Sequence, residues 1–457
     1  MNNYINVLIC MLIYNSSVSQ VLFGNMINLE NQEIKLESFN GFKTYLVSKT
    51  SIDNKGNFEL QYSSEDYGVG YLLSTDNKPL FVILNGEDIE IKGDALSYPE
   101  TIKFTKGKEN QWFEQYAKEQ PKREQALNAW LYLEKLYKAD SLFFLQTKPQ
   151  KAIKEEKQRI KDEEQAFIDS LPIDSYVKWF LPIRKLVSTV SIIAQYRTEE
   201  IPNTIRAFRE LDYADVRLYK SGLFKEAIDN HFWLLENSGK TLDLAYDEMK
   251  ISIDSMFINL VSDEKIFNEV TDHLFDLLER HSLFKVSEYL ALKILNENSC
   301  TLEADLAKQL ETYRAMAKGN IAPDIVFNGN TFFPAVNIDK LSDISNEYII
   351  VLFGASWCPK CQEEIPKIGE LYPKWKNLGV EVVLVSLDEN ESSFNEFVRD
   401  FPFISTCDYQ KWDGKIVNDY YVFSTPTMFL LDKNRKIILR PNSVKQMDAW
   451  VDWYLKK

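Results

Sequence analysis

Cysteine and histidine are scarce in this chain. Five cysteines and three histidines occur in 457 residues. Five cysteines are too few for a disulfide-based scaffold, and three histidines supply little material for a metal site or a catalytic triad. We expect Cys300 and Cys407 to be free thiols, with Cys407 in a core. Only Cys358 and Cys361 stand close together in the sequence, so cysteine chemistry is expected at this pair.

Positive charge is also in short supply. Lysine and arginine total 53 against 68 aspartates and glutamates, which gives a net charge of −15. This balance argues against a nucleic-acid partner, because nucleic-acid binding requires concentrated lysine and arginine. A chain of this length is expected to form about three domains rather than one. Its hydrophobic content of 45% is sufficient for buried cores.

The apolar run at the N-terminus, residues 5–14, is too short to span a bilayer. Small and polar residues follow it up to Gln20, a pattern typical of a cleaved secretory signal. Residues 1–4 contain no lysine or arginine, so the usual positive segment is missing, and a first buried strand is the alternative interpretation. The residues before Cys10 are too large for a lipid-attachment site. We predict a signal peptide over residues 1–20, export to the periplasm without lipid attachment, and no transmembrane segment in the mature chain.

Residues 21–106 are predicted to form an all-β domain. Segments 32–36 and 88–92 alternate polar and apolar residues, as half-buried strands do. Glycine-containing turn signals recur at near-regular spacing, at Asn40-Gly41, Asn85-Gly86 and Gly93-Asp94. Several short strands separated by such turns favour a β-sandwich.

Residues 107–320 are predicted to form a helical domain. Apolar residues recur at helical spacing, as at Ile253, Met256, Phe257 and Leu260. Pro172, Pro182 and Pro202 are expected to divide the region into several helices. We interpret the charged segment 151–164 as a solvated helix face with ion pairs, and a binding role is the alternative.

The residues around the cysteine pair predict a strand, a tight turn and a helix. Residues 348–353 form an apolar run typical of a strand buried on both faces. Ile365 and Ile368, after the pair, have helical spacing. Cys358 is therefore expected at a helix N-terminus, where unpaired N–H groups and the helix dipole favour a thiolate. Cys361, one turn later, is close enough to form a disulfide with it.

A Cys-x-x-Cys pair can also be half of a zinc site. Such a site needs two further ligands at compatible spacing, and the chain contains no second Cys-x-x-Cys and no histidine pair. The pair is therefore interpreted as a redox-active dithiol, and we expect no metal and no other cofactor.

Further residues form an ordered set around this dithiol, namely Ala322-Pro323-Asp324, Asn328-Gly329, Trp357, Pro366, the apolar segment 380–386 and Thr425-Pro426-Thr427. In this order they resemble the thioredoxin-like proteins of the bacterial envelope typified by TlpA and ResA. The resemblance covers residues 321–457 and implies a C-terminal α/β thioredoxin fold. The whole chain is thus predicted to be multidomain, with a β-sandwich, a helical middle domain and a thioredoxin-like domain.

The resemblance also implies roles for single residues. Cys358 is expected to be exposed and to attack a substrate disulfide, and Cys361, more buried, to resolve the mixed disulfide. Trp357 is expected to cover one side of the site. Pro426 is expected to follow a cis bond and to pack against the sulfurs. The backbone of Thr425 would then pair with an extended substrate segment.

One departure from thioredoxin concerns proton transfer. Thioredoxin carries a buried aspartate six residues before its first active-site cysteine, whereas this chain has Leu352 there. A proton acceptor for Cys361 must therefore come from elsewhere. Glu364 is the candidate, and Asp388 is a weaker one. Alternatively, Glu363 and Glu364 only complement the helix dipole.

The resulting functional hypothesis is a thiol–disulfide oxidoreductase that acts on disulfide-bearing exported proteins. We expect it to be a reductant supplied by a membrane electron donor. The alternative is an envelope binding or sensor protein whose N-terminal domains recognise a partner and whose dithiol is a redox switch. Turnover of a disulfide substrate distinguishes the two.

Overall fold

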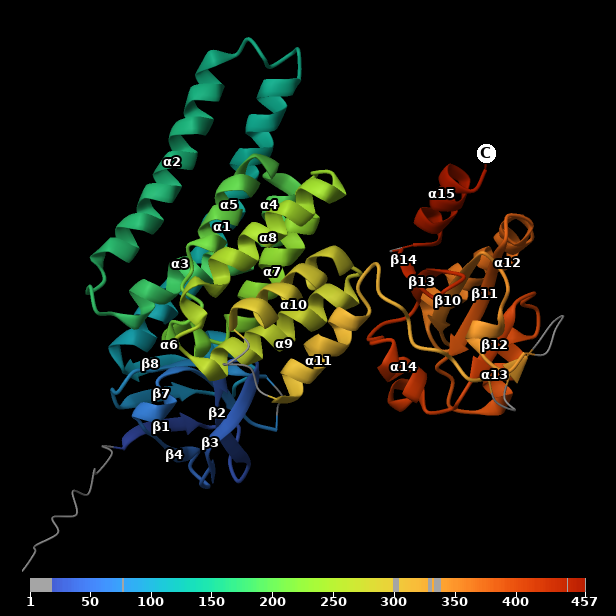
Figure 1. The fold of residues 1–457 in the computed structure, drawn as a ribbon. Helices are drawn as coiled ribbons and strands as arrows, with labels where there is room; N and C mark the ends of the chain where they lie inside the picture. Colours follow the sequence, from blue (N-terminus) through green and yellow to red (C-terminus); the bar gives the residue numbers. More distant parts are fainter. Residues whose placement is uncertain are drawn as a thin grey trace, which may run out of the picture. The chain divides into compact units, whose positions relative to one another are not determined.

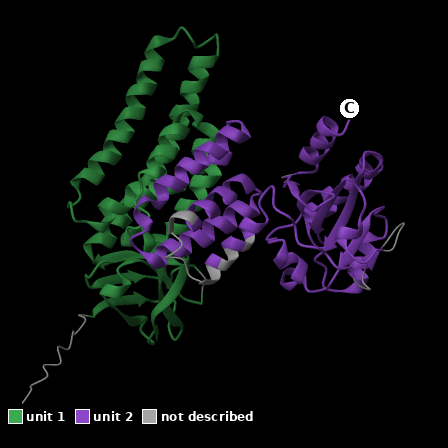
Figure 2. Ribbon diagram, viewed as in Figure 1, with its two compact units in different colours: residues 1–234 green, residues 235–457 purple. Residues whose placement is uncertain are grey.

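The computed structural model describes residues 19–75, 78–298, 304–327, 331–332, 338–441 and 443–456. Strands β1–β8 come first, helices α1–α11 follow, and a mixed α/β region begins with β9, which confirms the predicted multidomain fold class (Figure 1). The chain divides into two compact units, residues 1–234 and 235–457 (Figure 2). The domain limits at residues 106 and 320 stay predictions. Most of the predicted signal peptide, Cys300 and the Asn328-Gly329 turn lie outside the described residues.

The first unit begins with a β-sandwich. Its strands are β1 (Gln20–Met26), β2 (Glu33–Asn40), β3 (Lys43–Ser51), β4 (Asn57–Tyr62), β5 (Gly68–Leu73), β6 (Leu80–Leu84), β7 (Ile89–Gly93) and β8 (Lys103–Lys106). They form two four-stranded sheets, ordered β4-β1-β7-β8 and β3-β2-β5-β6. Among the described strands of these two sheets, only β1 and β7 pair in parallel.

Side chains alternate between the two faces of the second sheet. Leu72 and Leu84 point into the core between the two sheets. Val69 and Ile83 lie on the other face and join an apolar cluster with Phe113, Phe180 and other helical residues. Strands β5 and β6 are therefore buried on both faces, because the period of two along a strand supplies apolar residues to each side, whereas the edge strand β3 has no buried residue.

Helix α1 is fixed to the sandwich by two buried side chains near its start. Asn110 donates to the carbonyl of Ile83 and accepts from its N–H, both at 2.8 Å, which continues the hydrogen bonding of the edge strand β6. Glu109 accepts the N–H of Val177 at 2.9 Å and the hydroxyl of Ser175 at 2.8 Å. These bonds satisfy donors at the start of α3 that would otherwise be buried without partners.

The helices of the first unit are α1 (Lys108–Ala139), α2 (Thr147–Ser170), α3 (Tyr176–Ser188), α4 (Val190–Tyr196), α5 (Ile201–Arg209), α6 (Val216–Tyr219) and α7 (Phe224–Glu236), the last of which crosses the unit boundary. One expectation was wrong: Pro182 does not separate helices but lies inside α3. Pro202 stands at the start of α5, where its missing N–H removes no helical hydrogen bond.

The second unit starts with the helices α8 (Leu242–Leu260), α9 (Glu264–Arg280), α10 (Phe284–Asn298) and α11 (Ala304–Ala315). The predicted apolar stripe of α8, at Ile253, Met256, Phe257 and Leu260, is buried. After α11 the backbone pairs with the last strand of the C-terminal sheet. Gly319 donates to the carbonyl of Ile437, and Ile437 donates to the carbonyl of Asn320, both at 2.8 Å.

The C-terminal region contains the strands β9 (Thr331–Phe332), β10 (Tyr348–Gly354), β11 (Val380–Ser386), β12 (Ile404–Cys407), β13 (Thr427–Asp432) and β14 (Ile437–Leu439). Its helices are α12 (Pro359–Asn377), α13 (Glu391–Val398), α14 (Lys415–Asp419) and α15 (Val444–Tyr454). The sheet order is β14-β13-β10-β11-β12-β9, with β10 parallel to β11 and antiparallel to β13. β10 is central and buried on both faces, as its apolar run predicts.

Among the residues that the structure describes, no helix combines the length and the apolar composition needed to cross a membrane. Within the same described ranges, no three histidine, cysteine, aspartate or glutamate side chains are grouped to hold a metal ion.

Candidate active site

The cysteine pair lies where β10 ends and α12 begins. Cys358 is the N-cap residue of α12, with extended backbone angles, and Pro359 occupies the first turn, where no N–H is required. The Cys358 sulfur accepts the N–H of Cys361 at 3.1 Å. It thus satisfies one of the free donors at the helix start, and the same donor stabilises a thiolate.

The two cysteines form a disulfide, with their Cα atoms 5.2 Å apart. Both are buried: 5% of Cys358 and none of Cys361 is exposed. The expectation that Cys358 is exposed was wrong in this oxidised state, because the sulfur is turned inward toward Cys361 and the 425–426 segment. The predicted order of accessibility, with Cys361 the more buried, is confirmed.

The segment facing the disulfide contains the predicted proline. The Thr425–Pro426 peptide bond is cis, as the resemblance implies. The Cys358 sulfur lies 3.4 Å from the carbonyl oxygen of Thr425, a distance at which a reduced thiol can donate. Residues 67 positions apart in the sequence therefore meet at one sulfur.

Trp357 is 42% exposed beside the cysteines. Its indole N–H donates to the carbonyl of Leu387 at 3.2 Å, and its ring makes an edge contact with Trp412. The Lys411 ammonium lies 5.3 Å from the centre of the Trp357 ring, a cation–π distance. Sequence reasoning missed Lys411 and Trp412, because nothing in their local pattern connects them to Trp357.

A buried carboxylate fixes the turn before the cysteines. Asp388, fully buried, accepts the backbone N–H of Ser356 at 3.2 Å and its hydroxyl at 2.5 Å. It also accepts the hydroxyl of Ser386 at 2.6 Å. Asp388 was the weaker candidate for proton acceptor. Its described partners are serines rather than Cys361, so its contacts position the turn, and Ser356 is a site residue that the sequence did not reveal.

Glu364 is held by lysines. Its carboxylate lies 2.8 Å from the Lys367 ammonium and 3.4 Å from that of Lys360, and its side chain is 13% exposed. The hydrogen bond from Lys367 lowers the pKa of the Glu364 carboxyl. Glu363 has the same two partners but is 59% exposed. No described contact joins Glu364 to either cysteine.

A glycine permits close packing behind the cysteines. A Cβ atom at Gly354 would collide with the Cδ1 atom of Ile365 and would lie 3.6 Å from the Cys361 sulfur. The absent side chain lets α12 approach the end of β10 closely. Sequence reasoning missed Gly354, although a glycine directly after an apolar strand is a recognisable signal for close approach.

Cys407, the fifth cysteine of the chain, belongs to the core. Cys407 is 1% exposed, and burial raises the pKa of its thiol to about 11. Its sulfur lies 3.3 Å from the carbonyl oxygen of Asp388. The expectation that it belongs to the core is confirmed.

A cavity of about 760 Å³ opens beside the cis bond. Thr425 and Pro426 line it together with Glu364 and Lys360 from α12 and Arg280 from the end of α9. The cavity therefore borders both the cis bond and several charged residues.

Comparison with known proteins agrees with this geometry. A family model described as thioredoxin-like matches residues 346–437. The thiol-disulfide oxidoreductase ResA of Bacillus thuringiensis subsp. konkukian (strain 97-27) is 33% identical over 118 residues, which cover 26% of this chain and 67% of the relative.

Two solved structures are also similar. A thiol:disulfide interchange protein from Bacteroides sp. is 21% identical, with 31% of this chain and 91% of that chain covered and a TM-score of 0.27. A thioredoxin-like protein from Bacteroides caccae ATCC 43185 is 17% identical, with 56% and 93% covered and a TM-score of 0.39.

The C-terminal fold and its dithiol define a thioredoxin-fold enzyme of the thiol–disulfide oxidoreductase class. Through this domain the chain belongs to the ResA/TlpA-type family of thioredoxin-like proteins. The family match does not extend to the β-sandwich or to the first helices, which precede residue 346.

Proposed function

We propose that this enzyme is a reductant that acts on disulfide-bearing exported proteins in the periplasm. The observation that supports this proposal is the placement of the Cys358 sulfur. It lies at the start of α12, accepts the Cys361 N–H at 3.1 Å and is 3.4 Å from the Thr425 carbonyl oxygen. A thiolate there is stabilised by the helix and stands beside backbone that a substrate can pair with.

The proposed reaction has two exchange steps. The Cys358 thiolate attacks one sulfur of a substrate disulfide, and the other substrate sulfur leaves as a thiolate that takes up a proton. The Cys361 thiolate then attacks the Cys358 sulfur of the mixed disulfide, which releases the second substrate thiolate. The substrate gains two electrons and two protons, and the enzyme ends as the Cys358–Cys361 disulfide.

Substrate binding is assigned to the surface around the cis bond. The half-buried Thr425 would hydrogen-bond through its backbone with an extended substrate segment. Pro426 offers no N–H and would keep that segment next to the sulfurs. Trp357, with 42% of its surface exposed, would contact the substrate from the other side.

Glu364 remains the proposed proton acceptor for Cys361. It lies three residues after Cys361 on the same helix, is the less exposed of the two adjacent glutamates and borders the cavity at Pro426. Accepting a proton requires it to exchange one of its lysine partners.

The cycle needs two electrons to restore the dithiol. A membrane-bound dithiol carrier is proposed as the donor, and residues 1–20 as the signal that exports the chain to it. Mass spectrometry of the native protein should find a mature N-terminus near Gln20. An intact Met1 in a cytosolic fraction would contradict the export proposal.

Trapping tests the proposed reaction. In a Cys361→Ser variant the resolving thiol is absent, so Cys358 should remain linked to its substrates as adducts that dithiothreitol releases. The Cys358→Ser/Cys361→Ser variant is the matched control and should carry none. Equal recovery of adducts from both variants would show that the cysteine pair is not the reacting group.

The direction of electron flow is tested by measuring the reduction potential of the Cys358–Cys361 pair in equilibrium with glutathione. A reductant should have a potential closer to the about −270 mV of thioredoxin than to the about −120 mV of a strong oxidant. The sensor alternative predicts adducts or oxidation without catalytic turnover of a disulfide substrate. Multiple turnover by the full chain would therefore exclude it.

A further inference from the structure

The loop between α1 and α2 carries exposed apolar side chains. Leu142, Phe144 and Leu145 are 76%, 60% and 80% exposed, and we refer to these three residues as the apolar tip. The loop is ordered by Asp140, whose carbonyl accepts the N–H of Phe144 at 2.9 Å and whose carboxylate accepts that of Leu142 at 2.8 Å. Three large apolar side chains held together outward are more than the scattered exposed residues of an ordinary surface.

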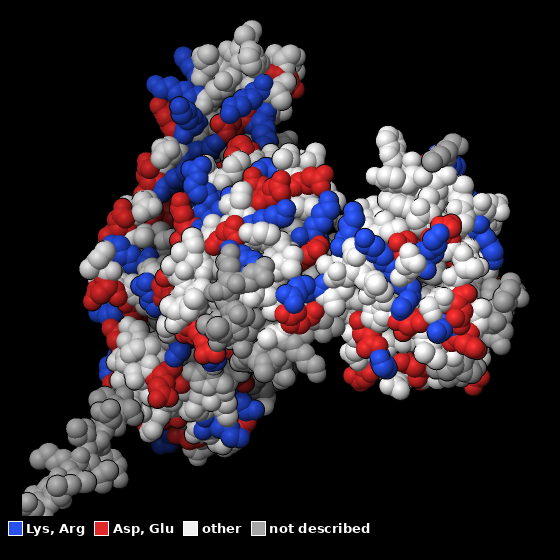
Figure 3. All heavy atoms as spheres, viewed as in Figure 1, with Lys and Arg blue, Asp and Glu red and all other residues white. Residues whose placement is uncertain are grey.

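Lysines surround the apolar tip. Residues 135–154 contain five lysines and a single acidic residue, in a chain whose net charge is −15. Lys138 precedes the tip on α1, and Lys148, Lys151 and Lys154 follow it on α2, all with exposed side chains. Figure 3 shows lysine and arginine side chains along this hairpin, with aspartate and glutamate side chains among them.

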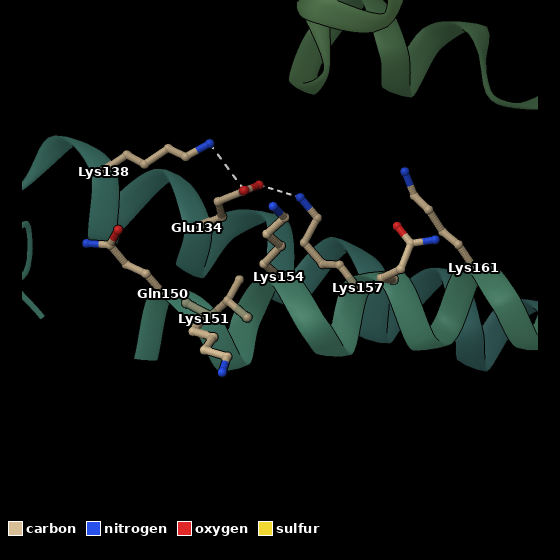
Figure 4. A pocket seen from close by; sticks show the side chains of 9 residues that line it. Glu134, Lys138, Gln150, Lys151, Lys154, Lys157 and Lys161 are labelled. Atoms are coloured by element: carbon tan, nitrogen blue, oxygen red, sulfur yellow. Dashed lines mark hydrogen bonds and ion pairs between the residues drawn. The ribbon is translucent and has the colours of Figure 1, made fainter. Parts of the chain in front are cut away.

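A basic cavity of about 580 Å³ continues this surface between the two helices. Five lysines and Glu134 border it (Figure 4). Glu134 is already engaged by two of the lysines, Lys138 at 3.2 Å and Lys157. Lys154 and Lys161 form no ion pair with any residue in the described parts of the chain. The cavity therefore has ammonium groups available for an anionic ligand.

The expected solvated helix face accounts for only part of segment 151–164. Arg159 forms pairs with Glu156 and Glu163, and Lys151 lies 3.6 Å from Glu155, as a solvated face predicts. Lys148 and Lys154, nearer the loop, form no ion pair with any residue that the structure describes, whereas Lys138 and Lys151 do. Within its own unit, the outer part of the hairpin projects from the other helices (Figure 2), which leaves the apolar tip accessible.

We propose that the α1–α2 hairpin docks on the surface of a membrane containing anionic lipids. The apolar tip would enter the boundary between headgroups and acyl chains, and the lysines behind it would contact lipid phosphates. The order of the groups along the hairpin favours a bilayer over an acidic protein, because a bilayer presents its anionic layer above its apolar interior. This inference does not depend on the dithiol.

Flotation with vesicles tests the proposal. The full chain should bind vesicles of phosphatidylcholine with about 30% phosphatidylglycerol, because a partly anionic surface attracts the lysines. It should not bind vesicles of phosphatidylcholine alone. Lys148→Gln/Lys151→Gln/Lys154→Gln should weaken binding about 100-fold, since each lysine near an anionic surface contributes about five-fold. Leu142→Ser/Phe144→Ser/Leu145→Ser should lose binding even at low salt.

Matched controls separate the hairpin from other surfaces. Lys49→Gln/Lys92→Gln/Lys103→Gln removes three exposed lysines of the sandwich, and Ile173→Ser removes an apolar side chain that is 91% exposed. Both should bind as the parent does. All variants keep residues 1–20, so the N-terminal apolar run contributes equally to each, and an unchanged urea denaturation profile shows that they are folded.

Two results would overturn the proposal. One is equal vesicle binding by the parent and both hairpin variants. The other is absence of vesicle binding together with self-association that the tip substitutions abolish in sedimentation, which would assign the tip to a second copy of the chain.

Discussion

The buried carboxylate of Asp388 accepts both the N–H and the hydroxyl of Ser356, a residue 32 positions earlier and two positions before Cys358. This contact connects the end of β11 to the turn that carries the cysteines. It holds the turn in the shape that directs the Cys358 sulfur toward both the start of α12 and the Thr425 carbonyl. The geometry of the dithiol therefore depends on a residue outside the Cys-x-x-Cys motif.

Replacing Asp388 with Ala should destabilise the C-terminal domain and slow disulfide reduction. The substitution leaves the half-buried N–H and hydroxyl of Ser356 and the buried hydroxyl of Ser386 without their acceptor, and each buried unsatisfied group costs about 1–3 kcal/mol. We expect urea denaturation to give a loss of about 2–4 kcal/mol. Ser356→Ala removes only one hydroxyl and should cost less. If the losses in unfolding free energy of the two single variants add fully in the double variant, Asp388 and Ser356 are not energetically coupled.

The cysteines should differ in reactivity once the disulfide is reduced. Cys358 should be alkylated first by limiting iodoacetamide at neutral pH, because it is the less buried thiol and its thiolate receives the Cys361 N–H. Cys407 is the internal control. Burial raises its thiol pKa to about 11, so it should stay unmodified until the chain is unfolded. Peptide mass spectrometry gives the order, and faster labelling of Cys361 would reverse the assigned roles.

Glu364→Gln should slow the step in which Cys361 closes the disulfide. If the carboxylate accepts the Cys361 proton, its removal should reduce that rate about tenfold to hundredfold and change its pH dependence, in line with general base catalysis. Glu363→Gln is a matched control. Glu363 has the same two lysine partners as Glu364, but its side chain is far more exposed. Stopped-flow measurement of the resolving step distinguishes them. Equal, small effects would assign both glutamates to ion pairing alone.

Acid should destabilise the first unit through His231. This side chain is fully buried, stacks on Phe208, and its imidazole nitrogens have no hydrogen-bond partner among the described residues. Burial lowers its pKa from 6.5 to about 3. Between these two values the unfolded chain binds the proton and the folded chain does not. The stability is therefore complete above about pH 6.5 and falls by up to about 1.4 kcal/mol per unit as the pH decreases toward 3.

His231→Phe keeps the aromatic stack and removes the titrating group, so it should flatten this dependence in urea denaturation at pH 7 and pH 4.5. His281→Gln is the control, because His281 is 37% exposed and pairs with Glu236. It should keep the acid sensitivity of the parent. An unchanged slope in His231→Phe would show that other groups cause the acid effect.

The sequence alone determined the nature of the chemistry. The features that predicted the dithiol are local: an apolar strand, then Trp357 and Cys358, then helical spacing from Ile365 onward. Such local features determine a helix N-terminus with two cysteines without any contribution from distant residues. The ordered motifs up to Thr425-Pro426 then predicted the thioredoxin-like fold. Alternation in segments 32–36 and 88–92 likewise predicted the sandwich, because a period of two follows from strand geometry.

Only the tertiary structure decided which distant groups meet. Strand order and helix placement, which no local periodicity encodes, bring together three pairs of distant residues: Asp388 with Ser356, Cys358 with Thr425, and Asn110 with Ile83. The burial of Cys358 and the exposure of the apolar tip depend in the same way on what packs around each side chain. By its sequence alone, the apolar segment 142–145 is compatible with a core helix and with a projecting loop. The surrounding chain determines which of the two it becomes, because burial is a property of the whole packed unit.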